Sequence, residues 1–324
     1  MSSVQTLPET PIRVLGSEAE AIAAAREIAT EIAAIAADSQ ANGQLPRRQA
    51  QLLSESGLTA IGVPKAFGGL GASVATIVET VRLISVADGG VGQLLQIHNV
   101  MLRGLFNGYP DAVRDRLVGD VLAGKRLGNA LAEIGGKNKF ALKTRIERRA
   151  DGKLILNGSK FYSTGSYLAE WISLTAASED GGAGVLLNRN APGLTLVDDW
   201  HAFGQQNSVS GTVIFDNIEL DEDFVSPRKG PMKRTGLTFP QILHAAIDTG
   251  IAAGALGRRW TTSNSTPGPG WKAASITPAK SRTSSSRSVN TPWPCALPSH
   301  CCAMPPESSM NTNRTRRTRN CRTS

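Results

Sequence analysis

The most informative segment for the fold, Arg126 to Ser178, reads RLGNALAEIGGKNKFALKTRIERRADGKLILNGSKFYSTGSYLAEWISLTAAS. Apolar and polar residues alternate through Lys153–Asn157 and again through Glu170–Ala176, a period of two that is typical of half-buried strands. The pairs Asp151-Gly152 and Asn157-Gly158 are typical of tight hairpin turns. The stretch therefore predicts a meander of short antiparallel strands.

The residues before this stretch follow a helical pattern. Ser17 and Glu20 form a capping box, and apolar residues recur at helical spacing as far as Ile35. Four further helices are predicted, from Pro46 to about Gly57, from Ser73 to about Ala87, over Val91–Phe106, and from Pro110 to Ala123. Residues 1–125 are therefore expected to form an all-helical domain.

The pattern after this stretch is first strand-like and then helical. Three further strands are predicted, at Ala183–Leu187, Leu194–Val197 and Thr212–Ile218. Ser208, Ser210 and Thr212 alternate there, and a solvated strand face and a ligand contact explain the alternation equally well. Apolar residues then recur every three to four positions over residues 239–252. We expect a middle β-domain over residues 126–232 and the start of a second helical domain over 233–257, which is an α+β organisation.

The charge of the chain is concentrated near its end. The net charge is +8, but residues 258–324 hold eleven Lys or Arg and one acidic residue, so residues 1–257 carry a net charge of −2. The basic balance therefore indicates neither a nucleic-acid nor a membrane partner for the folded part. All four cysteines also lie in the tail, without the spacing of a zinc site, so no metal is expected. No apolar run is long enough to span a membrane, and no signal pattern begins the chain.

Residues 258–324 lose the helical periodicity and are rich in Ser, Thr, Pro, Arg and Cys. One interpretation is a disordered tail, because such a composition buries little apolar surface. The other is a shift of the reading frame, since codons read one register away permit Ala-, Leu- and Glu-rich helical strings. We favour the frameshift. It predicts a C-terminal helical bundle reduced to its first helix, whose apolar face would then lack a partner.

Several motifs carry a resemblance to a known family. A-E-x-G-G at Ala132, then T-x₆-D-G-x₃-L-N-G-x-K up to Lys160, then E-W-I at Glu170 resemble the middle β-domain of the acyl-CoA dehydrogenase superfamily. The resemblance implies an N-terminal helical domain, an antiparallel β-barrel domain that contacts a flavin ring, and a C-terminal helical bundle. It also implies a homotetramer for the intact family fold, which is doubtful for a truncated chain.

The flavin contacts that the resemblance implies come from two segments. Asn129, Leu131 and Ala132 match the first strand beside the ring, and Tyr162, Ser163 and Thr164 match an aromatic-x-Thr/Ser segment at its face and N5 edge. The alternative for Tyr162 is a core aromatic residue, and for Thr164 an ordinary strand residue.

One loop of this chain differs from the corresponding loop of the dehydrogenases. The dehydrogenase motif E-P-x-x-G-S-D corresponds to Glu133–Lys139, which reads E-I-G-G-K-N-K. Asn138 therefore stands in place of the Ser that, in the dehydrogenases, helps to hold the flavin and the acyl thioester. With G-N-A-x-x-E and an upstream helical His98, the chain resembles instead the branch of dibenzothiophene monooxygenase and the sulfur-acquisition oxidoreductases. In that branch, the resemblance implies, His98 and Asn129 hydrogen-bond the oxygenated flavin. A histidine on an apolar helix face is otherwise a core residue.

The function implied is an FMNH2-dependent monooxygenase of small organosulfur compounds, supplied with reduced FMN by a separate flavin reductase that meets it by diffusion. Its location would be cytoplasmic, and the chain as written would be inactive. Two alternatives stay open. One is an acyl-CoA dehydrogenase that uses FAD, and the other is a non-enzymatic remnant.

Overall fold

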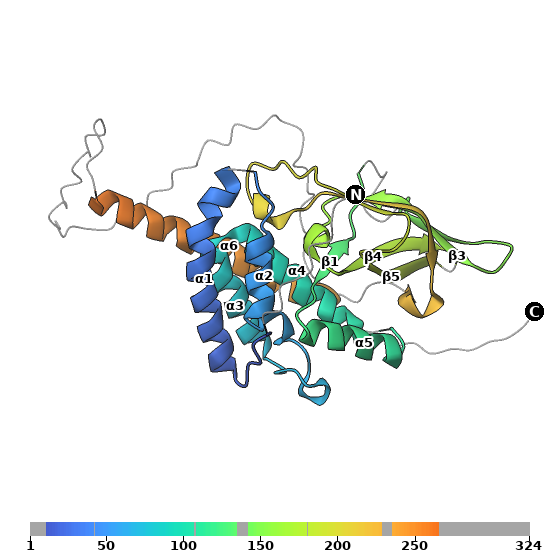
Figure 1. The fold of residues 1–324 in the computed structure, drawn as a ribbon, viewed down its shortest axis with the longest axis horizontal. Coiled ribbons are helices and arrows are strands. Elements are labelled where there is room, and N and C mark those ends of the chain that lie inside the picture. Colours follow the sequence, from blue (N-terminus) through green and yellow to red (C-terminus); the bar gives the residue numbers. More distant parts are fainter. Residues whose placement is uncertain are drawn as a thin grey trace, which may run out of the picture. The chain divides into compact units, whose positions relative to one another are not determined.

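The structure of the chain is a computed structural model, drawn as a ribbon in Figure 1. It describes residues 11–41, 43–106, 108–134, 142–179, 181–228 and 235–265. Contacts divide the chain into one unit of residues 1–268 and another of residues 269–324, and every described residue belongs to the first. The predicted tail therefore lies outside the described residues, except for its first residues up to Ser265.

The predicted helices are confirmed. They are α1 (Glu18–Ala41), α2 (Arg47–Glu55), α3 (Val74–Ala87), α4 (Gly89–Leu105), α5 (Asp111–Leu122) and α6 (Thr235–Ser265). Local caps set where several of them begin, because the first N–H groups of a helix lack partners within it. The Glu20 N–H donates to Ser17 Oγ at 3.2 Å, and the Thr76 N–H donates to Ser73 Oγ at 3.2 Å. Asp88 caps α4, which starts two residues earlier than the apolar pattern predicts.

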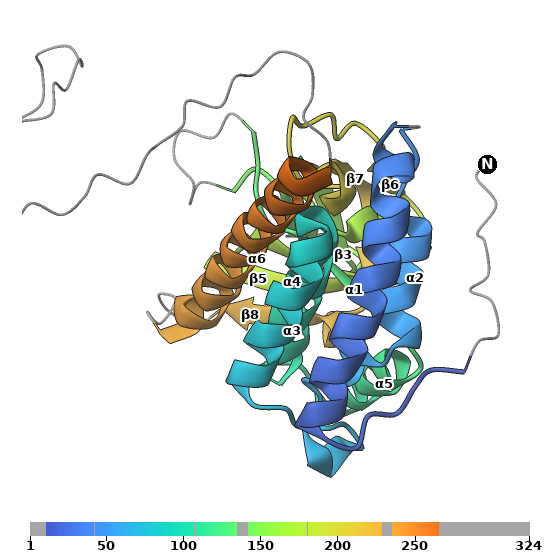
Figure 2. The same ribbon diagram turned by 90° about the vertical axis from the view of Figure 1, so that its left-hand side faces the viewer.

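Helices α1, α3, α4 and α6 lie alongside one another (Figure 2). Ile77, Val81 and Ile84 of α3 share one buried apolar core with Leu243 and Ile247 of α6. The expectation that α6 has an apolar face without a partner is therefore wrong, because α3 and α4 cover that face. Its backbone also continues past Gly257 to Ser265. None of the helices in the described part is both long and apolar enough to cross a bilayer.

In the described residues the strands form one eight-stranded sheet in the order β6-β7-β3-β2-β4-β5-β8, with β1 beside β4. The strands are β1 (Leu127–Ala130), β2 (Arg145–Arg148), β3 (Leu154–Lys160), β4 (Trp171–Ser178), β5 (Gly181–Asn188), β6 (Leu194–Val197), β7 (Thr212–Leu220) and β8 (Val225–Arg228). The sheet is mixed, because β1 and β2 pair with β4 in parallel. The predicted meander is thus antiparallel only in part. In the described part no pairing joins β6 to β8 as a closed barrel would require.

Asn157-Gly158 is not the predicted turn. Both residues lie inside β3, and the register with β7 shifts between Leu156 and Gly158. Gly158 has φ +140°, and a Cβ atom there would lie 2.6 Å from the Cα atom of Thr144. A glycine at such a point allows a β-bulge, which bends the strand without ending it.

Candidate active-site cleft

A cleft of about 620 Å³ lies where the helices meet the sheet. A volume of roughly 300–1,000 Å³ is usual for a site that takes a small molecule or cofactor. Its walls come from α4, β1, the segment after β3, the loop before β7, and α6. They are formed by Gln93, Ile97, Asn129, Leu131, Ala132, Tyr162, Thr164, Trp200, Ala202, Gly204, Gln205, Ser208, Ser210 and His244.

The structure brings together five of the residues expected to contact flavin: Asn129, Leu131, Ala132, Tyr162 and Thr164. Backbone hydrogen bonds join their two segments. The Asn129 N–H donates to the Thr164 carbonyl at 3.1 Å, and the Phe161 N–H donates to the Ala132 carbonyl at 2.9 Å. Ser163 does not line the cleft, because it is 1% exposed and its N–H donates to the Gly211 carbonyl. Their contact with flavin remains a prediction.

Two buried amide oxygens at the cleft lack hydrogen-bond partners among the described residues. They are Oδ1 of Asn129 and Oε1 of Gln205. Leaving a buried acceptor without a partner costs about 1–3 kcal/mol, so such atoms are uncommon in folded proteins. Both atoms belong to residues that line the cleft, so a ligand there could donate hydrogen bonds to them.

Three buried hydroxyl groups form a chain along the cleft wall. Thr164 Oγ1 and Ser210 Oγ lie 2.8 Å apart, and so do Ser208 Oγ and Ser210 Oγ. The two links use two of the three hydroxyl protons, so one O–H remains to donate elsewhere. Ser208 and Ser210 are 1% and 2% exposed, which rules out the solvated strand face for these two residues. The chain can reverse its direction and so serve either a donor or an acceptor.

Tyr162 is not the core aromatic of the alternative interpretation, since it is 57% exposed. Its ring packs edge-on against Phe161 and Trp200, with centroids 4.6 and 5.7 Å away. Its backbone has φ +53°, in the left-handed region that costs a residue with a Cβ atom roughly 1–2 kcal/mol. Strained residues of this kind gather at ligand sites, and this one places an aromatic ring at the wall of the cleft.

His98 does not line the cleft, which corrects the expectation that it faces the flavin. The residue is 2% exposed. Its Nε2 donates to the Thr59 carbonyl at 2.8 Å in η1 (Leu58–Ala60), and its Nδ1 accepts from the Leu127 N–H at 3.1 Å. Burial lowers the pKa of His98 to about 4, although the Thr59 bond opposes it, and the Arg126 charge adds to the lowering. The ring is thus a neutral link between the helices and β1.

Replacing His98 by Ala should lower the melting temperature and leave flavin binding and turnover per folded molecule unchanged. The free energy of unfolding should fall by about 2 kcal/mol, because two buried backbone groups lose their partners. The loss should be largest above pH 6.5 and shrink toward pH 4, where the unfolded wild-type chain gains a proton that the folded chain excludes. Denaturant titrations between pH 4 and pH 7 measure this loss of unfolding free energy. A loss of turnover in fully folded His98→Ala protein would contradict the structural role of His98.

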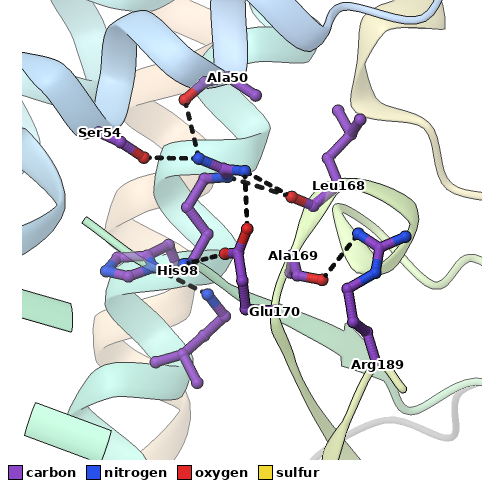
Figure 3. A network of polar contacts seen from close by, with 9 residues as sticks. Ala50, Ser54, His98, Leu168, Ala169, Glu170 and Arg189 are labelled. Atoms are coloured by element: carbon purple, nitrogen blue, oxygen red, sulfur yellow. Dashed lines mark hydrogen bonds and ion pairs between the residues drawn. The ribbon is translucent and has the colours of Figure 1, made fainter. Parts of the chain in front are cut away.

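Arg126, which directly precedes β1, joins this strand to the helices and to the segment before β4. Figure 3 shows its partners Ser54, Leu168 and Glu170. Its guanidinium donates to Ser54 Oγ at 2.6 Å in α2, to the Leu168 carbonyl at 2.7 Å, and to Glu170 Oε1 at 3.2 Å. Its backbone N–H donates to the other Glu170 oxygen at 2.7 Å. This network sets the position of the strand that carries Asn129.

Glu133, expected to belong to a substrate or flavin loop, instead holds the segment after β1 to the end of β3 and to the residues before β2. It accepts hydrogen bonds from Lys160 Nζ at 2.6 Å and from the N–H groups of Lys143 and Thr144 at 2.6 and 3.0 Å. Burial raises the pKa of Glu133, but these bonds, led by Lys160, outweigh it and bring the pKa to about 2. Glu133 does not line the cleft, and Asn138 lies outside the described residues.

Replacing Glu133 by Gln should destabilise the protein at neutral pH and remove part of its acid sensitivity. Because its pKa is lowered on folding, the carboxylate contributes stability above pH 4.5 that is lost as the pH falls toward 2. Unfolding measured at pH 7 and pH 3 should show a smaller difference for the variant than for the wild type. Glu147→Gln, at an exposed position of β2, is the matched control. Equal acid sensitivity in wild type and Glu133→Gln would contradict the assignment.

Four polar or aromatic residues of the cleft escape sequence analysis: Gln93, Trp200, Gln205 and His244. They come from α4, the loop before β7, and α6, so no local spacing connects them. His244 Nδ1 lies 2.9 Å from the Pro240 carbonyl, which can only accept, so this nitrogen holds a proton. Among the described residues no group of three or more His, Cys, Asp or Glu is placed to hold a metal ion.

Comparison with known proteins agrees with this fold. Residues 17–125 match the acyl-CoA dehydrogenase N-terminal domain family. The probable FMNH2-dependent monooxygenase SfnC of Pseudomonas putida is 27% identical over 258 residues, covering 76% of this chain and 63% of that protein. A dibenzothiophene monooxygenase of Rhodococcus erythropolis is 28% identical over 283 residues, covering 79% and 64%. These comparisons agree with the family resemblance that the motifs carry, and both relatives are named as monooxygenases, the first as a probable one.

Among solved structures, FMN-bound TdsC of Paenibacillus sp. A11-2 superimposes with a TM-score of 0.69 at 23% identity. The match covers 76% of this chain and 65% of that one, and it supports the fold. The chain thus spans less than two thirds of the length of the two curated relatives.

Proposed function

We propose that the protein is a flavin-dependent monooxygenase that takes reduced FMN and oxygenates small organosulfur compounds. The observation that carries the proposal is the cleft, in which Asn129, Tyr162 and Thr164 converge from separate segments. The names of the two curated relatives give the proposal its cofactor and reaction.

The residues of the cleft fit a flavin ring. The ring presents hydrogen-bond donors and acceptors at one edge and an apolar face, and the cleft offers both kinds of wall. The partnerless Oδ1 of Asn129 accepts, the hydroxyl chain from Thr164 donates or accepts, and Leu131 and Ala132 supply apolar surface. A bound reduced flavin would supply the electrons and the activation of oxygen, which no side chain does.

The chain itself would orient the ligands and control protons. Asn129 and Thr164 would hold the polar edge of the ring, and the hydroxyl chain would pass a proton by reversing its direction. Tyr162 and Trp200, whose rings meet edge-on, would shield this wall from water. Excluding water from such a site strengthens every hydrogen bond within it and suppresses side reactions.

The main alternative is an acyl-CoA dehydrogenase with FAD. Such an enzyme needs a carboxylate base beside the substrate, and none of the described residues lining the cleft is Asp or Glu. Glu133, the carboxylate that directly follows the cleft residue Ala132 in the chain, is not available as that base. Its carboxylate accepts hydrogen bonds from Lys160 and from two backbone N–H groups. This composition favours the monooxygenase.

The test uses the full chain with FMN or FAD, first for retention of flavin and then for reaction. Retention of FMN is the expected result. Oxygen consumption that depends on reduced FMN and a sulfone is expected of a chain whose reading frame after residue 257 is restored, because the chain as written is expected to be inactive. Bleaching of the bound flavin by an acyl-CoA without oxygen would establish the dehydrogenase instead. Failure to retain either flavin would favour the non-enzymatic remnant and agree with an inactive chain. A reductase that supplies FMNH2 by diffusion and a cytoplasmic location belong to the same proposal. Homotetramer assembly belongs to it for the intact family fold, not for the truncated chain.

A further inference from the structure

One buried hydrogen bond joins the start of α4 to the loop before β7. Asp88 is 7% exposed, and Asn207, in η4 (Gln206–Ser208), is 2% exposed. Asp88 Oδ2 accepts from Asn207 Nδ2 at 2.6 Å, while its Oδ1 accepts from the N–H groups of Gly90 and Val91 at 2.8 and 3.1 Å. A hydrogen bond to a carboxylate is about twice as strong as one between neutral groups. The residue that caps α4 therefore also holds this loop.

The backbone of the loop is strained on both sides of η4. Gln205 has φ +52° and Val209 has φ +45°, in the left-handed region that residues with a Cβ atom seldom adopt. Val209 is the less usual of the two, because its side chain branches at Cβ. Conformations of this kind persist where the surrounding contacts fix them. The segment Gln205–Val209 therefore depends on contacts with the rest of the protein for its shape.

The contacts that fix this segment come from several elements. From the segment after β3, the Gly165 N–H donates to the Ser208 carbonyl at 3.2 Å. The side chain of Val209 is buried in the apolar core of the helices. The bond between Asp88 and Asn207 adds the charged contact at the start of α4. Of these contacts, this bond is the one that a substitution can remove or reverse without changing the backbone or the apolar core.

The same segment carries part of the cleft wall. Gln205 and Ser208 line the cleft, and so does Ser210, one residue beyond the segment. Ser208 and Ser210 are two members of the hydroxyl chain that ends at Thr164. The Gln205 carbonyl also accepts from Trp200 Nε1 at 3.2 Å, so an aromatic residue of the wall leans on the same backbone. A shift of the segment would displace all of these groups together.

From these observations we propose that Asp88 and Asn207 are positioning residues, which hold the loop in the conformation that the ligand requires. Neither residue lines the cleft, so the pair acts through the loop and not by contact with the ligand. The inference takes its ligand, FMN, from the proposed function and adds to it two residues outside the wall. FMN affinity should therefore depend on a hydrogen bond that lies behind the wall.

Three variants of the full chain test the pair. Asn207→Ala removes the donor, and Asn207→Asp sets a second carboxylate against Asp88, while both keep the residue that caps α4. FMN affinity should fall roughly tenfold in Asn207→Ala and further in Asn207→Asp, because a buried carboxylate loses its partner or gains a like charge. The exchanged pair, Asp88→Asn with Asn207→Asp, should recover most of the affinity. It keeps the net charge, reverses donor and acceptor, and retains a cap, since Asn caps a helix as well as Asp does.

Hydrogen exchange gives a second readout that needs no flavin. The N–H groups of Gly165 and Ser208 donate to carbonyls of this loop, at 3.2 and 3.0 Å. They should exchange roughly tenfold faster in Asn207→Ala and near the wild-type rate in the exchanged pair. Ser73→Ala is the matched control, because Ser73 caps α3 but does not line the cleft. It should lower the melting temperature and leave FMN affinity and these exchange rates within about twofold of the wild type.

Wild-type exchange at Gly165 and Ser208 in both single variants of Asn207 would overturn the inference. Faster exchange with unchanged FMN affinity would overturn it as well, and so would an exchanged pair that recovers neither property. A wild-type chain that binds no FMN would instead count against the proposed function, and the exchange rates would still decide whether the pair holds the loop. Thermal unfolding shows that each variant is folded before the affinities are compared.

Discussion

Replacing Arg126 by Met should destabilise the protein by about 3–5 kcal/mol, because the change leaves the carboxylate of Glu170 buried without its cation. The Arg126 side chain is 11% exposed and that of Glu170 is 20% exposed. The guanidinium also donates to Ser54 in α2 and to the carbonyl of Leu168 in η3 (Ser166–Leu168). Those bonds join the helices to the sheet, so β1 should exchange its amide protons faster in the variant. Chemical unfolding and hydrogen exchange measure the two effects.

Two further variants separate the charge from the packing. Arg126→Met combined with Glu170→Gln should recover part of the lost stability, since no buried charge is then left unpaired. Arg149→Ala removes an exposed arginine directly after β2 and should change stability by less than about 0.5 kcal/mol. A loss in Arg126→Met no larger than in Arg149→Ala would show that the network does not hold β1 in place.

Replacing Gly90 by Ala should abolish or strongly weaken flavin binding and cost roughly 3 kcal/mol of stability, the upper part of the range for overpacked sites. A Cβ atom at Gly90 would lie 2.7 Å from the backbone nitrogen of Ser208 and 2.8 Å from the carbonyl carbon of Asn207. Both atoms belong to backbone in or beside η4 (Gln206–Ser208), which cannot rotate away as a side chain does. The loop must shift, and Ser208, Ser210 and Gln205 of the cleft shift with it.

Gly104→Ala is the matched control on the same helix, α4. A Cβ atom at Gly104 meets nothing within 4 Å. The change should therefore stabilise the helix by about 0.5–1 kcal/mol, because alanine loses less backbone entropy than glycine. Flavin titration measures the affinity of the two variants, and thermal unfolding measures their stability. Wild-type flavin affinity in Gly90→Ala would mean that the loop before β7 does not form the ligand site.

Features that depend on contacts between residues close in the chain could be predicted from the residues alone. The capping box of Ser17 and Glu20 and the cap at Ser73 are local hydrogen bonds, so the spacing of a few residues was enough to place the starts of α1 and α3. Apolar periodicity likewise predicted α4 and the strands β3 and β4, because one buried face sets the period. The family resemblance also came from the sequence, through motifs between Ala132 and Ile172, and residues 17–125 match the N-terminal domain of that family.

Features that depend on contacts between distant segments could not be predicted and are seen only in the folded protein. Asn157-Gly158, a pair typical of turns, forms a bulge within β3, because β3 pairs with β7 on both sides of this pair and Thr144 packs against Gly158. His98 joins the helices to β1 and does not line the cleft, because both of its ring nitrogens form hydrogen bonds with backbone groups, those of Thr59 and Leu127. His244 entered the cleft because α6 packs on α3 and α4. Hydrogen bonds and packing between distant segments have no sequence period, so only the folded chain reveals them.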